Sequence, residues 1–361
     1  MKYNCINYCL HHERRSCLDS LCEGAKGAVH PCYVKQQFTL PTKCEMSTMK
    51  LSLVVPCYNE AENVAAFQDA VITAFDGCGY DYEIVFINDG SKDATLHNLK
   101  KLHAAQKCPT KVVSFSRNFG KEAGIYAGLE HASGEYISLI DADLQQRPEI
   151  VRDMVKILDE ESQYDVVAAY QDRRNEGKVL SFFKKSFYST INKLSKVQLQ
   201  SDASDFRTFR RSVRDSILEL REYHRFSKGI FAWVGYDTKF IPYTACERNA
   251  GTTKWNFWKL MNYAIEGIIG YSTAPLRLAT LLGGLTAFAS MIYLIVVVLQ
   301  KLIWGIAVPG YASIIVLILL LGGIQLVCIG IIGEYVGRTF EQSKNRPVYV
   351  PKEYLTYENE Q

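Results

Sequence analysis

Two aspartates stand one residue apart at the end of an apolar stretch. The segment SLIDADLQQRPEI, residues 138–150, runs from apolar residues into Asp141 and Asp143, then Gln145 and Pro148. Two carboxylates with an amide oxygen nearby suit a hard divalent cation such as Mg2+ or Mn2+, and such a cation commonly holds a diphosphate. The simpler alternative is a strand that ends in a turn, with Asp143 capping a helix that Pro148 opens. For an isolated Asp-x-Asp that alternative is the better one, so the rest of the chain must decide.

Three other polar motifs, PCYNE, NDGS and SRNFGK, also follow short apolar runs. The strand-like runs alternate with helical patterns and cover residues 51–56, 82–89, 111–116 and 135–143. Strands separated by helices imply parallel pairing, and parallel α/β sheets bind ligands beyond the carboxyl ends of their strands. Four polar strand ends at one edge of a sheet indicate a ligand-binding site. Helix capping alone therefore does not account for the two aspartates at this edge. The fold class is therefore expected to be α/β.

The ligand of this site is not indicated by the common phosphate-binding motifs. No G-x-x-x-x-G-K-[ST] and no G-x-G-x-x-G occurs, so neither a P-loop nor a dinucleotide fingerprint is present. Gly120, Gly124 and Gly128 recur every four residues, which favours close packing of a helix against the sheet. The histidines show no metal-ligand spacing.

Two apolar stretches dominate the C-terminal third. Residues 278–299 and 311–333 are uncharged and mostly apolar, and each is long enough to cross a hydrocarbon core that needs about 20 helical residues. Two buried core helices are the alternative, but the stretches are too long and lack a polar face. Arg277 precedes the first stretch, four basic residues follow the second, and the connection offers only Lys301. The positive-inside rule then predicts a cytosolic domain and tail.

Charge and cysteine usage exclude further classes. A net charge of +3 over 361 residues does not suggest a nucleic-acid partner. Six of the 11 cysteines lie before residue 45 without a C-x-x-C pair, which argues against a zinc site there. The first 48 residues show no sustained helix or strand period, and we expect a disordered, cysteine-rich extension.

Several motifs together carry a family resemblance. VVPCYNEAENV, INDGSKDAT, SFSRNFGKEAGIYAGLEHASGEY, DADLQ and DFRTFRR, followed by ERNAGTTKWNFWKL, the two apolar stretches and GEYVGRTFEQSKNRPVYV, resemble the polyprenyl-phosphate glycosyltransferases of glycosyltransferase family 2. The bactoprenol glucosyltransferase branch looks most similar, and dolichol-phosphate mannose synthase belongs to the same group. The resemblance implies a Rossmann-like GT-A domain and inverting transfer of a hexose, with UDP-glucose as the expected donor and undecaprenyl phosphate as the expected acceptor. It also implies Mg2+ or Mn2+ as cofactor.

The resemblance also assigns roles to residues of this chain. The nucleotide-sugar contacts it implies are Pro56, Tyr58, Glu60, Asp89, Lys121 and Asp141. The metal ligands it implies are Asp141, Asp143 and Gln145. The catalytic residues it implies are Asp143 and the basic pair Arg248 and Lys254, which hold phosphates.

Simpler roles stay open for some of these residues. Glu60 could lie in the first turn of a helix, where its charge suits the dipole, and Asp89 before a glycine is a good turn residue. Arg248 and Lys254 could be cations attracted to an anionic membrane surface. Both roles can hold for these two, because the expected acceptor is itself an anionic lipid.

The chain departs from the family pattern at three places. IND replaces the more usual VDD, so Asn88 occupies a position that is often acidic. DLQQRPE stands where relatives often have a run like DLQDPPE, so Gln146 and Arg147 are substitutions. Gln171 stands where an arginine is expected, with Arg173 and Arg174 close behind, and which of these two replaces it is open. The metal ligands are kept, whereas the charge of the loop has changed.

The expected organisation has five parts. They are a disordered extension (1–48), a GT-A domain (49–250), interfacial amphipathic helices (251–275), a transmembrane hairpin (276–334) and a cytosolic tail (335–361). The protein is expected in the plasma (inner) membrane as a multi-pass protein, with a nucleotide sugar and a polyprenyl phosphate as partners and a homo-oligomer left open. The rival functions are a non-catalytic lipid carrier and a processive polysaccharide synthase, which would be expected to carry Q-x-x-R-W; this motif does not occur.

Overall fold

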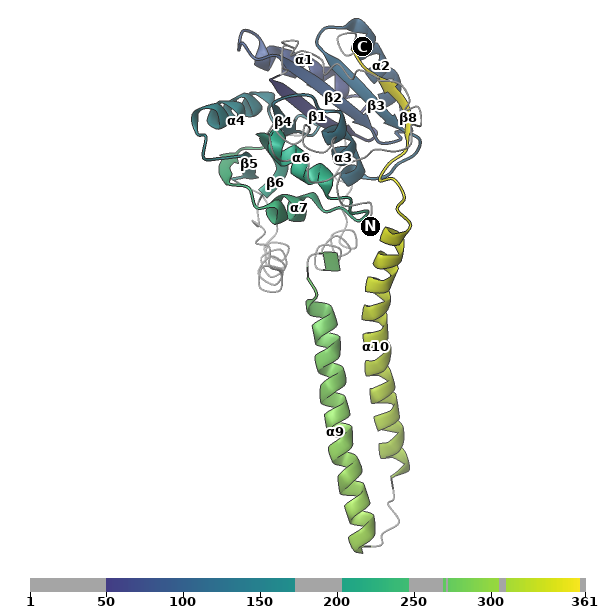
Figure 1. Ribbon diagram of the computed structural model, residues 1–361. Coiled ribbons are helices and arrows are strands. Elements are labelled where there is room, and N and C mark those ends of the chain that lie inside the picture. Colours follow the sequence, from purple (N-terminus) through teal and green to yellow (C-terminus); the bar gives the residue numbers. More distant parts are fainter. Residues whose placement is uncertain (1–49, 173–202, 247–268, 271, 305–309, 358–361) are drawn as a thin grey trace, which may run out of the picture. The chain divides into compact units, whose positions relative to one another are not determined.

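The computed structural model describes residues 50–172, 203–246, 269–270, 272–304 and 310–357 (Figure 1). The helices and strands of these residues are β1 (Leu51–Cys57), α1 (Val64–Phe75), β2 (Tyr82–Asn88), α2 (Thr95–Ala105), β3 (Thr110–Phe115), α3 (Lys121–His131), β4 (Tyr136–Leu139), α4 (Pro148–Glu160), β5 (Val166–Gln171), β6 (Ala203–Arg210), α6 (Arg211–Glu219), α7 (Ser227–Val234), β7 (Thr238–Tyr243), α9 (Ala274–Trp304), α10 (Tyr311–Ser343) and β8 (Pro351–Leu355). The expected extension, residues 1–48, lies outside the described residues.

The strands form one sheet in the order β7-β5-β6-β4-β1-β2-β3-β8. Strand β1 pairs in parallel with β2 and β4, and β2 pairs in parallel with β3. This confirms the α/β, Rossmann-like GT-A class and the parallel pairing predicted from the alternating pattern. Because these four strands run the same way, the loops that follow them leave from one edge of the sheet.

Helices cover both faces of the sheet, and the alternation of side chains along β1 explains how. Leu53 and Val55 pack in a core with α1 and α4, whereas Val54 packs on the opposite face with α3. A Cβ on Gly128 would lie 2.1 Å from a Val54 methyl carbon, so this glycine lets α3 approach the sheet closely. The packing interpretation is thus confirmed for Gly128. Gly120 is different, because its φ of +98° is the reason for glycine there and no atom crowds it within 4 Å.

Three strands could not be anticipated as sheet members. Strand β6 inserts antiparallel between β4 and β5, and β7 pairs in parallel with β5 at the outer edge. Strand β8, from the segment expected as a tail, pairs antiparallel with β3. Tyr349 precedes β8 and stacks on Phe115 of β3 with ring centroids 4.7 Å apart. The C-terminal segment is therefore part of the sheet domain.

The two apolar stretches form the helices α9 and α10, which are longer than the spans expected from the sequence. Ala274–Ile303 and Val316–Ser343 are long and apolar enough to cross a membrane, and the most apolar stretch of each is not buried within the protein. The alternative of two buried core helices is therefore wrong. The Tyr335 hydroxyl of α10 donates to the carbonyl oxygen of Ser272, which precedes α9, at 2.6 Å. Most of the expected interfacial segment, residues 251–275, lies outside the described residues.

Candidate functional site

The loops that follow β1 and β2 are bonded to each other. The backbone N–H of Asn59 donates to Ser91 Oγ at 3.0 Å, and Asn59 Oδ1 accepts from the Lys92 N–H at 2.9 Å. Asn59 adopts a φ of +55°, a left-handed conformation that asparagine tolerates better than most residues. The polar motifs PCYNE and NDGS therefore form one continuous structure at the carboxyl edge of the sheet.

Pro56, Tyr58 and Glu60, the first expected nucleotide contacts, all lie in or just before this loop. Pro56 lines a small cavity shared with Lys121 and Asp141. Glu60 precedes the first turn of α1, and its Oε2 accepts from the Asn63 side-chain amide at 2.6 Å. The first-turn alternative for Glu60 is therefore wrong, and a contact of these residues with a nucleotide stays a prediction.

Asp89, the other expected nucleotide contact, is 4% exposed and holds the loop after β3. Its Oδ1 accepts from the Phe119 N–H at 2.6 Å, and its Oδ2 accepts from the Gly120 N–H at 2.9 Å and the Asn118 amide at 2.8 Å. Burial raises the pKa of this carboxyl, although the two backbone donors and Arg117 act against the rise. Asp89 thus organises the SRNFG loop, whether or not it also touches a ligand.

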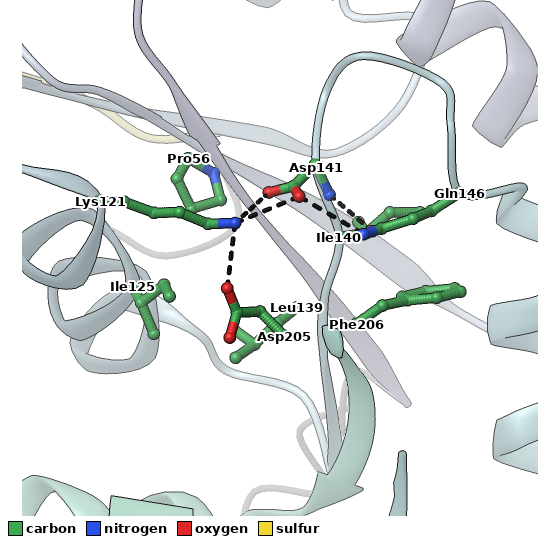
Figure 2. Close-up of a pocket in the computed structure, with 9 residues that line it drawn as sticks. All are labelled: Pro56, Lys121, Ile125, Leu139, Ile140, Asp141, Gln146, Asp205 and Phe206. Atoms are coloured by element: carbon green, nitrogen blue, oxygen red, sulfur yellow. Dashed lines mark hydrogen bonds and ion pairs between the residues drawn. The ribbon is translucent and has the colours of Figure 1, made fainter. Parts of the chain in front are cut away.

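A cluster of three charges occupies the centre of the edge (Figure 2). Lys121 is the first residue of α3, Asp141 follows β4, and Asp205 lies in β6. The Lys121 Nζ lies 2.8 Å and 3.1 Å from the two carboxylate oxygens of Asp141 and 3.2 Å from Asp205 Oδ2. All three residues line the cavity that also contains Pro56. The expected donor-phosphate contact Lys121 and the expected metal ligand Asp141 are therefore in direct contact.

The protonation of this cluster follows from its charges. Partial burial would lower the pKa of Lys121, but Asp141 and Asp205 raise it well above its ordinary value. Burial raises the pKa of Asp205, but the charges of Lys121, Lys228 and Arg207 outweigh it and lower this pKa to about 2. At neutral pH Lys121 is therefore an ammonium and Asp205 a carboxylate.

Glu122, the neighbour of Lys121, connects the cluster to α7. Its Oε2 accepts from the backbone N–H of Ser227 at 2.9 Å and from the Ser227 hydroxyl. Burial, followed by the charge of Asp205, raises the pKa of Glu122 to about 7, although the bonds from Ser227 and the charge of Lys121 oppose the rise. This contact joins the first turn of α3 to the first residue of α7.

Gln146, a substitution in the family pattern, fixes the position of Asp141. It is 5% exposed, and its Oε1 accepts from the Asp141 backbone N–H at 3.0 Å. Its Nε2 lies 3.4 Å from Asp141 Oδ2 as a donor. Figure 2 shows the Asp141 carboxylate between this amide and the Lys121 ammonium.

Asp143 and Gln145 lie in a tight turn beside Asp141. Asp143 Oδ1 accepts from the Gln145 N–H at 3.2 Å, and Leu144 between them has a φ of +60°. Pro148 opens α4 as expected, but Arg147 is its N-cap residue and no side chain caps the helix. The capping alternative for Asp143 is therefore wrong.

These residues fit a divalent cation in the chemistry of their donors. Two carboxylates and one side-chain amide supply the oxygen ligands that Mg2+ and Mn2+ prefer. In the part of the chain that the structure describes, no group of three or more His, Cys, Asp or Glu side chains is placed to hold a metal. A cation held by the two carboxylates and Gln145 would need further oxygens from a ligand to complete its coordination.

The expected basic pair, Arg248 and Lys254, lies outside the described residues, but the chain that leads to it is placed. The Cys246 N–H donates to the Gln145 carbonyl oxygen at 3.1 Å, and Arg147 Nε donates to Cys246 Sγ at 2.9 Å. Cys246, the last described residue before residue 247, therefore lies at the Asp-x-Asp loop. Gln171 ends β5, whereas Arg173 and Arg174 lie outside the described residues.

Sequence reasoning missed two residues of the site, Asp205 and Glu122, and the role of Gln146. Asp205 belongs to the motif DFRTFRR, which carried part of the resemblance, but the motif alone does not say which side chain reaches the site. Glu122 follows Lys121 directly and had no signal of its own. Gln146 was recognised as a substitution, and the structure shows that its buried amide bonds Asp141.

Comparison with known proteins now identifies the family. The profile of glycosyl transferase family 2 matches residues 52–218, and that of the GtrB C-terminal hairpin matches residues 274–339. The chain is 42% identical over 304 residues to the prophage bactoprenol glucosyl transferase homolog of Escherichia coli (strain K12), covering 84% of this chain and 99% of the relative. It is 41% identical over 304 residues to the bactoprenol glucosyl transferase of Shigella phage SfV, covering 84% and 98%.

A solved structure shows a looser likeness. Glucosyl-3-phosphoglycerate synthase from Mycobacterium tuberculosis, in complex with Mn2+, UDP-glucose and phosphoglyceric acid, is 19% identical and superposes with a TM-score of 0.42. The match covers 62% of this chain and 78% of that one, and it is too loose to transfer a ligand or a residue role. The family assignment rests instead on the relatives that align over most of both chains. On that ground, this chain belongs to glycosyl transferase family 2.

Proposed function

We propose that this protein transfers glucose from UDP-glucose to a polyprenyl phosphate, with undecaprenyl phosphate as the acceptor. The observation that carries the proposal is the match, over 84% of the chain, to relatives named bactoprenol glucosyl transferase. Those matches extend over 98% or more of the relatives and include both the sheet domain and the hairpin. The proposed location is the plasma membrane, with the sheet domain on the cytosolic side.

The carboxyl edge of the sheet supports a nucleotide-sugar site. It brings the PCYNE and NDGS loops together and places Lys121, Asp141 and Asp205 beside them. We assign Pro56, Tyr58, Glu60 and Asp89 to the nucleotide end of the donor. The charged cluster then faces the diphosphate.

A divalent cation, Mg2+ or Mn2+, is the proposed cofactor. Asp141, Asp143 and Gln145 would hold it, and when bound it would neutralise charge on the diphosphate leaving group. Lys121 supplies a further positive charge from the start of α3. Gln146 keeps the Asp141 carboxylate in place, because its amide bonds both the backbone and the side chain of that residue.

The proposed reaction needs no strong general base. A phosphate monoester has a second pKa near 6, so the acceptor phosphate is largely ionised at neutral pH. One of its oxygens forms a bond to the anomeric carbon of glucose while the bond from that carbon to the UDP oxygen breaks. UDP leaves, and attack opposite the leaving group inverts the anomeric centre. The main task of the site is to align two anions that repel each other.

Arg248 and Lys254 are the proposed groups for this alignment. The bond between Cys246 and Gln145 supports their assignment, since it holds Cys246, two residues before Arg248 in the sequence, at the Asp-x-Asp loop. The apolar helices α9 and α10 would keep the domain at the membrane surface, where a polyprenyl phosphate presents its charge. The acceptor and the donor would then meet at the carboxyl edge of the sheet.

The deciding experiment measures lipid-linked sugar formed by the full-length protein in lipid vesicles. The vesicles contain undecaprenyl phosphate, and UDP-glucose is compared with UDP-galactose, GDP-mannose and UDP-N-acetylglucosamine. We expect glucose transfer with Mg2+ or Mn2+ and its loss with a chelator. Asp143→Asn removes a charge without changing shape and should lower the rate by about 10²-fold or more. Asp153→Asn, on the exposed surface of α4, is the matched control and should keep the wild-type rate.

Other outcomes separate the rivals. A non-catalytic lipid carrier would consume no nucleotide sugar in any of these vesicles. A processive synthase would form a polymer rather than a single lipid-linked hexose. Either outcome would contradict the proposed reaction, as would full activity of Asp143→Asn in buffer containing the metal.

A further inference from the structure

The position of Lys121 is unfavourable for a residue that only stabilises the fold. It is the first residue of α3, where the positive end of the helix dipole disfavours a cation. Its side chain is 46% exposed, and ion pairs with that exposure contribute little to stability. A lysine at this place is better explained by the anions it meets than by the helix it begins.

Lys121 occupies the oxygens that a cation would need. Its Nζ lies within 3.1 Å of both carboxylate oxygens of Asp141, one of the two carboxylates assigned to the metal. It also reaches Asp205 from a different strand, at 3.2 Å. An ammonium and a divalent cation compete for the same negative oxygens, since each is attracted to the same charge.

We propose that Lys121 is an exchangeable counter-ion of the donor site. With no donor bound, its ammonium holds Asp141 and Asp205 together. When a nucleotide diphosphate and a divalent cation bind, Lys121 leaves Asp141 and pairs with the diphosphate. This inference rests on the proposed function, because it takes those two ligands from it.

The exchange has two consequences of opposite sign. Lys121 weakens the binding of the metal alone, because the ammonium must first leave the Asp141 oxygens. It strengthens the binding of the diphosphate together with the metal, because it then has an anionic partner again. The lysine therefore favours joint occupation of the site by donor and cation.

The experiment compares wild-type protein and Lys121→Gln as full-length chains in detergent micelles. Mn2+ binding is followed by electron paramagnetic resonance without nucleotide, and UDP binding by calorimetry in saturating Mn2+. Without nucleotide, Lys121→Gln should bind Mn2+ about two- to fivefold more tightly, the range of an exposed ion pair. In Mn2+, it should bind UDP about tenfold more weakly or worse, because a hydrogen bond to a charged group is lost.

Two controls define the result. Lys101→Gln removes the same charge from the exposed surface of α2 and should change neither affinity. Lys121→Arg keeps the charge and should restore most of the UDP affinity. Thermal unfolding of each variant verifies that the fold is intact.

Metal binding that is unchanged, weaker in Lys121→Gln, or undetectable in both proteins overturns the exchange. UDP binding that is unaffected by the substitution overturns it as well. These affinities are independent of sugar transfer. If both change as expected and no sugar is transferred, the exchange stands and the proposed reaction fails; the reverse outcome rejects only the exchange.

Discussion

Two lysine–carboxylate pairs lie at opposite edges of the parallel part of the sheet, and they differ in burial and in their hydrogen-bonded neighbours. Glu83 and Lys111 lie near the amino ends of β2 and β3, with Nζ 3.1 Å from Oε2, and their side chains are 0% and 2% exposed. Lys121 and Asp141 lie at the carboxyl edge, 2.8 Å apart, and are 46% and 35% exposed. The first pair of opposite charges is thus buried in the core, and the second is exposed at the carboxyl edge of the sheet.

Neighbouring groups surround the buried pair. Glu83 Oε1 accepts from the Ser133 N–H and hydroxyl, each at 2.7 Å, and Oε2 accepts from the Tyr357 hydroxyl at 2.8 Å. Lys111 also donates to the His131 carbonyl oxygen at 3.1 Å. Burial would raise the pKa of Glu83, but the charge of Lys111 and the hydrogen bonds from Ser52 and Ser133 lower it. A buried pair with its bonds satisfied in this way belongs to the fold.

The exposed cluster is arranged for exchange instead. Asp141 faces one ammonium and one amide, and solvent reaches more than a third of its side chain and nearly half of that of Lys121. An exposed pair gains little stability, so its partners can be replaced by a ligand at low cost. Each pair joins a lysine to a carboxylate, so residue type does not distinguish them. Burial and the number of hydrogen-bonded neighbours distinguish the structural pair from the pair that we propose to be functional.

The largest effect should come from breaking the buried pair. Lys111→Met keeps the length of the side chain but leaves the Glu83 charge uncompensated in the core, which should lower the free energy of unfolding by about 3–5 kcal/mol. Lys121→Met, the matched change at the exposed cluster, should cost less than about 1 kcal/mol. Urea unfolding of the full chain in detergent micelles measures both. Equal losses in the two variants would contradict the distinction between the pairs.

A smaller effect should come from changing the charge beside Asp141. Gln146→Glu can still accept from the Asp141 N–H, but its second oxygen would face Asp141 Oδ2 and repel it. We expect kcat/KM for the donor to fall about tenfold, or roughly 1.4 kcal/mol, measured at a temperature where thermal unfolding shows that the variant is folded. Gln163→Glu adds the same charge on the exposed surface and should have the wild-type value. A Gln146→Glu enzyme with normal kcat/KM would show that Gln146 does not position Asp141 for the reaction.

The smallest effect concerns the segment after β8. Tyr357→Phe removes one donor to Glu83 while Lys111 remains, so the free energy of unfolding should fall by about 1 kcal/mol. Tyr354→Phe removes a hydroxyl from a 45% exposed tyrosine of β8 and should cost less than about 0.5 kcal/mol. The measurement is the same unfolding experiment. If Tyr357→Phe had no effect, the C-terminal segment would not contribute to the buried pair.

The sequence by itself determined the fold class, the parallel strands and the two long apolar helices. These features depend on local patterns: an apolar run marks each of the strands that begin at Leu51, Tyr82, Thr110 and Tyr136, and length marks the helices α9 and α10. It also determined that the polar motifs share one edge, because parallel strands end on the same side. The resemblance also identified the family from the sequence, since the order of the motifs can be read along the chain. The assignment of Arg248 and Lys254 stays a prediction.

Only the tertiary structure decided which side chains meet. Strand β6 pairs with β4, and this pairing brings Asp205 to Lys121 and Asp141, although Asp205 is far along the chain from both. Strand β8 returns from beyond the apolar helices to pair with β3, and the chain after it places Tyr357 on Glu83. No local pattern contains this information, because strand partners and side-chain neighbours depend on how segments distant in sequence pack. The structure also distinguished Lys111 from Lys121, since burial is a property of the packed core and not of the residue.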